Sequence, residues 1–173
     1  SVNGGNYQQV TMGTAPGGRY EGGIPGQSAG AVVAFYVRGN DTEEESSQFP
    51  PFGAQRPALY EVDDGRAASN GLHNFRIVMS AADVSFMHVS TEVMSNDRLN
   101  ATVIDAESRI YYGCGVRLKS SERGRDNLNR VGYNVQFPAD NLYLGVHGKV
   151  AIDRSQGQSP GQRELLFDIM MSN

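Results

Sequence analysis

The stretch Asn100-Ala-Thr-Val-Ile-Asp-Ala-Glu-Ser-Arg-Ile-Tyr-Tyr-Gly-Cys-Gly-Val-Arg-Leu-Lys119 decides the fold class of this chain. Two runs rich in β-branched and aromatic residues lie on either side of the polar Ala106-Glu107-Ser108. Such side chains favour pleated strands, and a short polar connection between two such runs is typical of a β-hairpin. We therefore predict a hairpin with strands over residues 100–105 and 109–119.

The segments around this hairpin predict a mixture of strands and helices. Ser80-Ala-Ala-Asp83 is a capping signature, so a short helix is expected to begin there and to end near Met87. Residues 73–79 and 130–137 have the composition and alternation of strands. A capping-box spacing in 159–162, followed by an apolar stripe, predicts a second helix near the end of the chain. Residues 72–173 are thus interpreted as an α+β segment.

The first 62 residues carry strand-like runs separated by Gly and Pro turns. The longest is Ala31–Arg38, which is expected to form one central strand, and a polar acidic loop over 40–48 follows it. Strands at this spacing are typical of an immunoglobulin-like β-sandwich. Four are too few to close a sandwich, so the missing strands are expected before Ser1. The other predicted strands of this block cover residues 7–12, 19–24 and 57–62.

Between the two blocks, Asp63–Gly71 is small and polar and has the composition of a linker. The fold class predicted for the chain is mostly β with some α. It comprises a partial immunoglobulin-like sandwich over residues 1–62, a linker over 63–71 and an α+β segment over 72–173, each end of the chain being a truncation.

Composition excludes several classes of protein. The net charge is −4 and no basic block is present, so no nucleic-acid surface is expected. No apolar run approaches the length of a membrane-spanning helix, so no transmembrane segment is expected. The single cysteine, Cys114, cannot form an internal disulfide, and its apolar neighbours suggest an inert buried thiol.

The sequence predicts neither a catalytic residue nor a metal site. His73, His88 and His147 lie far apart and outside any zinc-binding pattern. The acidic residues around Asp41 and Asp63 could gather oxygen ligands for calcium, but they lack the spacing of a calcium loop, and solvated loop charge is the favoured interpretation. A carbohydrate-binding sandwich has little support because no Trp is present to stack on a sugar. Core or strand-face packing is favoured for Tyr111, Tyr112 and Tyr143.

Periodicity also predicts which side chains are buried. They are Val33, Phe35, Val37, Leu59, Phe75, Ile77, Ile110, Val116, Val135, Val150, Ile152, Leu166 and Ile169.

Four motifs occur in an order that resembles a known family. They are Gly115-Val-Arg-Leu-Lys-Ser-Ser-Glu-Arg-Gly124, Arg130-Val-Gly-Tyr-Asn-Val-Gln-Phe137, Asp153-Arg-Ser155 and Arg163-Glu164. This order resembles the N-terminal portion of the CotH family of spore-coat-type proteins, which have an atypical protein-kinase fold. Upstream, residues 18–41 resemble the bacterial immunoglobulin- or fibronectin-like module that precedes this domain in secreted, surface-attached proteins.

The resemblance implies a kinase-like N-lobe and a nucleotide site. Kinases hold nucleotide phosphates with a strand cation that a helix carboxylate positions. The nearest matches are Arg130 and Glu164, with Arg117 as a second basic candidate. The strand carries Arg130-Val131-Gly132 where relatives carry Lys-Lys-Ser, and Arg and Lys bind phosphate differently. The family's metal-binding and catalytic carboxylates are expected beyond Asn173.

The chain is therefore expected to be a segment of a secreted or surface-attached, bacterial, multidomain CotH-like protein. Phosphotransfer, with ATP and a divalent metal, is expected only in the intact parent, and no cofactor is expected in this segment. Its expected partners are the other domains of the same polypeptide. The alternative is a structural or adhesive extracellular module that self-associates or assembles with a surface protein into a layer or filament.

Overall fold

The structure is a computed structural model, and it describes residues 1–43, 45–67, 74–119, 125 and 131–153. Over these residues the chain is mostly β, with the α-helix α1 (Ala81–Met87), the short 3₁₀ helix η1 (Gly53–Gln55) and a helical residue at Arg125. The mostly-β class with some α is thus confirmed. The helix predicted from residue 159, and with it Glu164, lies outside the described residues, as does Arg130.

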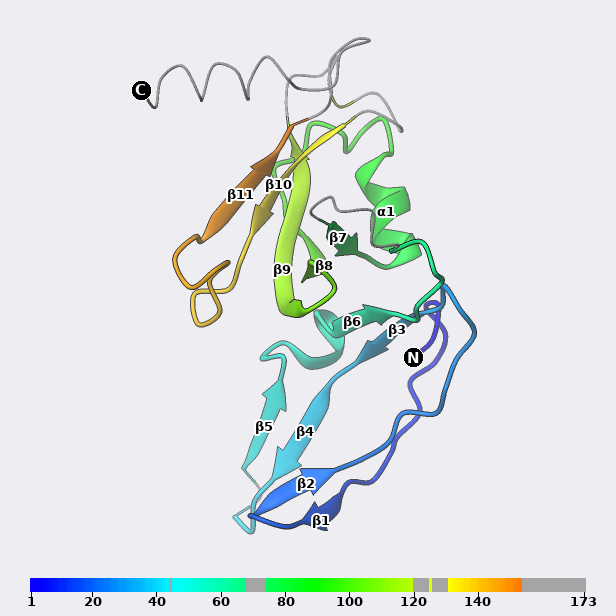
Figure 1. The fold of residues 1–173 in the computed structure, drawn as a ribbon, viewed down its shortest axis with the longest axis vertical. Coiled ribbons are helices and arrows are strands. Elements are labelled where there is room, and N and C mark those ends of the chain that lie inside the picture. Colours follow the sequence, from blue (N-terminus) through cyan, green and yellow to red (C-terminus); the bar gives the residue numbers. More distant parts are fainter. Residues whose placement is uncertain (44, 68–73, 120–124, 126–130, 154–173) are drawn as a thin grey trace.

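A five-stranded antiparallel sheet forms the upper part of the molecule (Figure 1). Its strands follow one another in sequence, in the order β11-β10-β9-β8-β7. The hairpin predicted over residues 100–119 is confirmed as β8 and β9, in the middle of this sheet. The bounds are β7 (Phe75–Val78), β8 (Leu99–Asp105), β9 (Arg109–Lys119), β10 (Gly132–Gln136) and β11 (Lys149–Ile152).

The helix α1 (Ala81–Met87) lies between β7 and β8 in the chain and begins at the predicted cap. The Oγ atom of Ser80 accepts a hydrogen bond from the backbone N–H of Asp83 at 3.0 Å and donates one to its carboxylate at 2.7 Å. The cap satisfies a backbone donor that the first helical turn leaves without a partner. At the other end, Met87 is buried in the main hydrophobic core. None of the helices among the described residues is long and apolar enough to cross a membrane.

The first 62 residues form three two-stranded sheets instead of one sandwich layer (Figure 1). The strand predicted over 31–38 is two strands with a break at Tyr36, so that prediction was wrong. The prediction of a loop over 40–48 was also wrong in part, because residues 46–48 belong to the strand β5 (Ser46–Phe49). The pairs are β1 (Gly13–Ala15) with β2 (Arg19–Glu21), β3 (Val32–Phe35) with β6 (Ala58–Glu61), and β4 (Val37–Asn40) with β5 (Ser46–Phe49).

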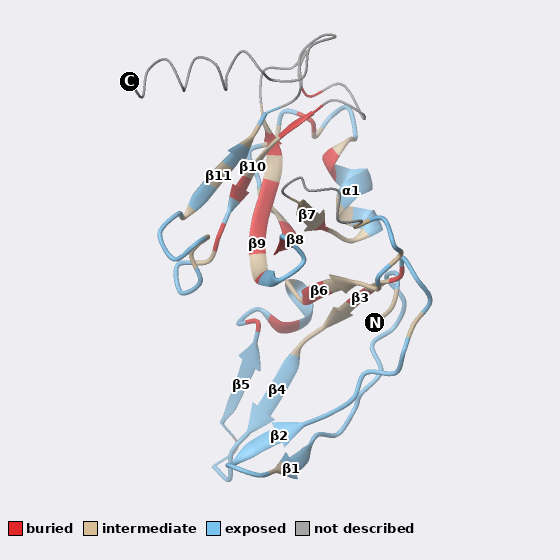
Figure 2. Cartoon of the chain, viewed as in Figure 1, coloured by how far each residue is buried: buried red, intermediate tan, exposed pale blue. Residues whose placement is uncertain are grey.

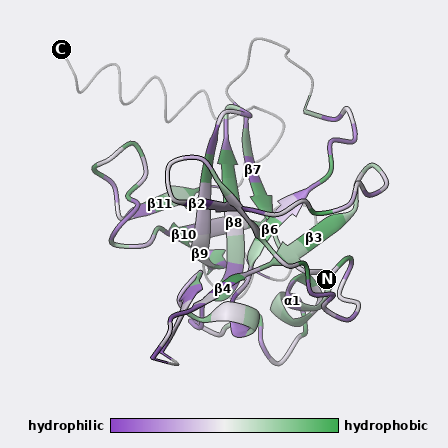
Figure 3. Ribbon diagram, turned by 90° about the horizontal axis from the view of Figure 1, so that it is seen from below, coloured by the Kyte–Doolittle hydropathy of each residue, from purple (hydrophilic) through white to green (hydrophobic). Residues whose placement is uncertain are grey.

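Local hydrogen bonds explain the unexpected hairpin. Asp41 accepts the backbone N–H groups of Glu43 and Glu45, both at 2.9 Å, through one side-chain oxygen. A short carboxylate that bonds to backbone two and four residues onward closes a turn, so the acidic segment returns as β5. Every residue of β4 and β5 is exposed, whereas the hydrophobic strand β3 buries Val33 (Figures 2 and 3).

The strand β6 attaches this block to the five-stranded sheet. Leu59 is 2% exposed and packs with Val78 of β7 and Ile104 of β8 in a small buried cluster. Its backbone N–H donates to the hydroxyl of Thr102 at 3.1 Å, and both groups are buried. A buried hydrogen bond and an apolar cluster therefore join residues that lie on either side of the segment predicted as a linker.

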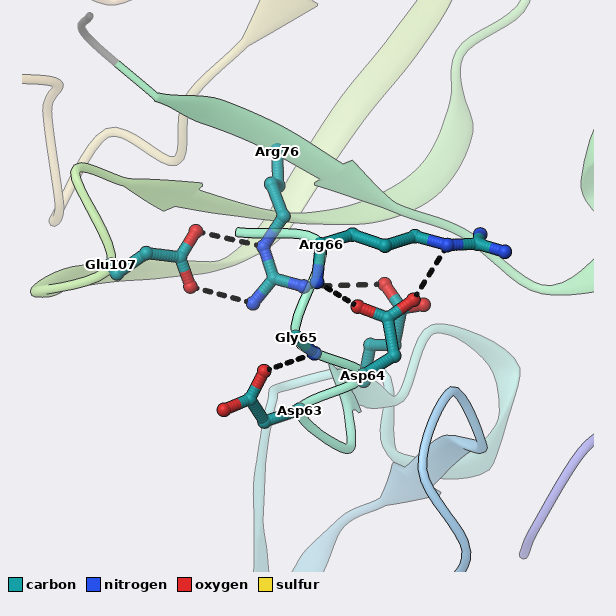
Figure 4. Close-up of polar contacts among 7 residues, drawn as sticks. Asp63, Asp64, Gly65, Arg66, Arg76 and Glu107 are labelled. Carbon is teal, nitrogen blue, oxygen red and sulfur yellow. Dashed lines mark hydrogen bonds and ion pairs between the residues drawn. The ribbon is translucent and has the colours of Figure 1, made fainter. Parts of the chain in front are cut away.

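A second attachment uses Arg76, which links β6, β7 and the β8–β9 turn (Figure 4). Its guanidinium donates to both oxygens of Glu107 at 2.8 and 2.7 Å and lies 3.4 Å from Glu61. Glu107 has a φ of 51°, so the bidentate pair holds a turn residue in a conformation that non-glycine residues seldom adopt. In the same view, Asp63 and Asp64 accept backbone N–H groups two residues ahead, a local turn within the predicted linker.

The strand β9 contains a β-bulge. Ala101 pairs with Cys114 and Val103 pairs with Tyr111, so two residues of β9, Tyr112 and Gly113, lie opposite one residue of β8. Gly113 has a φ of 69°, which a residue without a Cβ adopts at little cost. The bulge directs Tyr112 to the first block, where its ring meets that of Phe35 at 5.7 Å.

Candidate functional site

Three arginines come together near the end of β9 that carries Lys119. Arg117 lies on β9 and donates to the side-chain oxygen of Asn96 at 2.9 Å. Arg125 follows β9 and is 6% exposed, and its Nη1 donates to the backbone carbonyls of Val93 and Ser95 at 3.1 and 3.0 Å. Arg98 immediately precedes β8. We call Arg98, Arg117 and Arg125 the arginine cluster.

The side chain of Arg98 lies across Gly115 of β9. A Cβ atom at Gly115 would approach the Cβ and Cδ atoms of Arg98 to 3.0 and 3.1 Å, so glycine leaves room for this crossing. The Nη1 atom of Arg98 is buried and has no hydrogen-bond partner among the residues that the structure describes. A buried donor without a partner costs roughly 1–3 kcal/mol, and more when it is charged. An acceptor oxygen within hydrogen-bond distance of this atom would remove this cost.

The electrostatics of the arginine cluster favour an anion. Burial, and then the positive charge of Arg117, lower the pKa of Arg98, and the same two causes lower the pKa of Arg125. Within the described parts of the chain, neither Arg98 nor Arg117 forms an ion pair with a carboxylate. Partly buried cations that repel one another are stabilised when an anion binds between them.

The structure includes one of the three residues that the sequence predicted for nucleotide binding. Arg117 belongs to the arginine cluster, whereas Arg130 and Glu164 lie outside the described residues. Sequence reasoning missed Arg98 and Arg125. Arg98 lies two residues before the strand predicted over 100–105, but only the structure reveals that its side chain crosses β9 at Gly115.

No family model, curated protein or solved structure matches this chain. A function therefore has to come from the chemistry of its own residues. The arginine cluster is suited to binding phosphate or another oxyanion, since guanidinium groups present several N–H donors in a fixed plane.

The single cysteine does not contribute to this chemistry. Cys114 is completely buried, and its Sγ donates to the backbone carbonyl of Tyr111 at 3.3 Å. Burial raises the pKa of its thiol to about 12, so the nucleophilic thiolate hardly forms near neutral pH. The predicted burial of Cys114 is confirmed.

The acidic and histidine side chains do not assemble into a metal site in the described part of the chain. No three of its His, Cys, Asp and Glu residues lie close enough together to hold an ion. Of the predicted loop carboxylates, Asp41, Asp63 and Asp64 instead accept backbone N–H groups of their own turns. This local bonding agrees with the interpretation of these residues as loop charge.

Proposed function

We propose that the arginine cluster binds a phosphate group, and that the chain is a segment of a secreted or surface-attached multidomain protein of the CotH type. The observation that carries this proposal is the buried Nη1 of Arg98, which has no protein partner among the described residues and lies near the charge of Arg117. A terminal phosphate of a nucleotide would offer an acceptor oxygen to Nη1 of Arg98 and a negative charge to both Arg98 and Arg117.

Phosphotransfer belongs, in this proposal, to the intact parent protein. The five-stranded antiparallel sheet with a helix after its first strand supports a kinase-like N-lobe over residues 72–173. Arg130 and Glu164 are proposed to complete the phosphate site, and ATP and a divalent metal are assigned to the parent. The short hairpins of residues 1–62 are proposed as part of an immunoglobulin-like module that precedes the lobe.

Loss of two arginines is expected to weaken phosphate binding. In the double variant Arg98→Ala, Arg117→Ala, the affinity for pyrophosphate and for ATP should fall by at least about tenfold, because each charge-assisted hydrogen bond contributes roughly 1.5–3 kcal/mol. Calorimetric titration of the 173-residue chain measures this affinity. Raising the salt concentration should weaken binding to the unaltered chain.

Arg38→Ala is the matched control, because Arg38 lies on the exposed strand β4, far from the arginine cluster in the fold. It removes one positive charge and should leave both affinities unchanged. Equal binding by the double variant and the unaltered chain would contradict the proposal, and so would an absence of binding at millimolar pyrophosphate.

A second candidate function is a structural or adhesive role by self-association. The observation in its favour is a group of exposed apolar side chains on the block that carries β1, β2, β4 and β5, which projects away from the five-stranded sheet (Figure 1). Large apolar side chains that are exposed on one part of a molecule can mark a surface that binds another protein. The group comprises Tyr7, Val10, Met12, Tyr20, Ile24, Val37, Phe49 and Phe52, each at least 36% exposed.

If this surface joins copies of the chain, the double variant Tyr20→Ser, Phe52→Ser should associate at least about tenfold more weakly. Tyr20 and Phe52 are 65% and 60% exposed, so their replacement should spare the fold. Sedimentation velocity over a range of protein concentrations measures the association. Val89→Ser, at a 44% exposed position beside α1, is the control. A chain that stays monomeric at every concentration would exclude this role.

A further inference from the structure

An open cleft lies at the other end of β9, remote in the strand from Arg117. Its volume is about 530 Å³, within the range of roughly 300–1,000 Å³ that is typical of small-molecule sites. One wall is the start of β9, and the other is the loop between β10 and β11. The residues that carry the following argument are Arg109, Tyr111, Asp140, Asn141 and Leu144, all of which line the cleft.

The loop wall is fixed by hydrogen bonds and by ring packing. The backbone N–H of Leu144 donates to the hydroxyl of Tyr111 at 3.2 Å, which joins the loop to β9. Tyr143 and His147 exchange two backbone hydrogen bonds at 2.9 Å. The ring of Tyr143 stacks on that of Phe137, with 5.1 Å between centroids. The cleft is thus preformed, so a ligand would spend little free energy on ordering it.

A buried carboxylate orients the cationic side chain of the cleft. Asp105 is fully buried and accepts a hydrogen bond from the Tyr143 hydroxyl at 3.2 Å. Its other oxygen lies 3.4 Å from Nη1 of Arg109, whose side chain is 59% exposed. One N–H of the guanidinium is therefore directed to Asp105. The exposed remainder of the group supplies further planar donors at the edge of the cleft.

Leu144 gives the cleft an exposed apolar surface. It is 49% exposed and has a φ of 51°, and Gly145 follows with a φ of 77°. A left-handed conformation costs a residue with a Cβ roughly 1–2 kcal/mol. The contacts of the loop hold Leu144 in this conformation beside the polar side chains of Asp140 and Asn141.

From this arrangement we infer that the cleft binds a pyranose sugar. Arg109 supplies donors, Asp140 supplies acceptors and Asn141 supplies both, which is what a ring with neighbouring hydroxyl groups requires. Leu144 covers the C–H face of the sugar and removes apolar area from water, a role that does not require Trp. A phosphate is disfavoured here because Asp105 and Asp140 place negative charge at the cleft.

The inference is independent of the arginine cluster, and amide spectra of the labelled 173-residue chain test it. Methyl glucoside, methyl galactoside, methyl mannoside and glucuronate, each at millimolar concentration, are the probes. We expect at least one of them to shift the amide signals of residues 109–111 and 139–145. Pyrophosphate should leave these signals in place.

The variants Asp140→Ala and Asn141→Ala remove exposed groups whose side chains form no hydrogen bond among the described contacts. Each should weaken sugar binding at least about fivefold, since one hydrogen bond contributes roughly 1 kcal/mol. Asn6→Ala, at an exposed position outside the cleft, is the control and should bind as the unaltered chain does. Failure of all four sugars to shift these signals would overturn the inference. So would sugar binding by both cleft variants that equals binding by the unaltered chain.

Discussion

Replacing Leu59 with alanine is expected to lower the free energy of unfolding by about 2–5 kcal/mol, because the substitution leaves a cavity in a buried cluster. Leu59 packs with Val78 and Ile104, so the cavity would lie between the first 62 residues and the five-stranded sheet. For a chain of this size the melting temperature should fall by about 2–4 °C for each kcal/mol. Urea unfolding followed by tyrosine fluorescence and by circular dichroism measures the change.

The same experiment tests whether the two blocks unfold together. Because the buried Leu59–Thr102 hydrogen bond and the Arg76–Glu61 ion pair join the two blocks, both probes should report one transition that shifts as a whole. Val37→Ala removes methyl groups at a 37% exposed position of β4 and should change stability by no more than about 0.5 kcal/mol. Two separate transitions, with only the weaker one sensitive to Leu59→Ala, would show instead that the blocks are independent.

Replacing Phe137 with alanine is expected to cost about 3–5 kcal/mol of stability. Phe137 is 3% exposed, and its ring meets those of Tyr111 and Tyr143, each with 5.1 Å between centroids. Aromatic pairs of this kind stabilise by roughly 0.5–1.5 kcal/mol beyond the area that they bury. Denaturant unfolding measures the loss.

Phe137→Ala should also loosen the loop that forms the cleft. The amide protons of Tyr143 and His147, which bond to each other's carbonyls, should exchange with solvent at least about tenfold faster in the variant. Phe52→Ala removes a ring that is 60% exposed and should change neither stability nor exchange at these amides. Unaltered exchange in Phe137→Ala would mean that the loop holds its shape without the aromatic packing.

Local patterns could be predicted from the sequence because the interactions behind them are local. The β8–β9 hairpin follows from two strand-prone runs around a short turn, and the Ser80 cap needs only a hydroxyl three residues before an N–H group. Burial was predicted correctly for Val33, Leu59, Val116 and Val135, all at most 2% exposed. These side chains lie on strands whose inner faces pack in the cores.

The errors occur where structure depends on interactions that composition does not reveal. Val37 was predicted as buried, but β4 has no covering layer, and its Val37 is exposed. Ile110 was predicted as buried because it lies an even number of residues from Val116. It is 45% exposed, since the bulge at Tyr112 and Gly113 reverses the alternation of buried and exposed side chains along β9. A single extra residue in a strand moves side chains to the opposite face.

The candidate sites were the hardest to predict, for a related reason. Arg117 was identified through a resemblance of motifs. Arg98 comes near it through the register of β8 with β9, and Arg125 is held nearby by hydrogen bonds to Val93 and Ser95. The cleft depends on the carboxylate of Asp105 meeting Tyr143, 38 positions away in sequence. Contacts over such separations are set by the completed sheet.

The bulge in β9 also divides this strand into two parts in which buried and exposed side chains alternate in opposite order. Before it, the side chain that enters the core is the odd-numbered Tyr111, and after it the core residues are the even-numbered Cys114, Val116 and Leu118. The cleft lies beside the part of β9 before the bulge, and the arginine cluster lies beside the part after it. The bulge therefore brings Tyr111 and Cys114, three positions apart in the sequence, into the same hydrophobic core, which strict alternation along a strand would not allow.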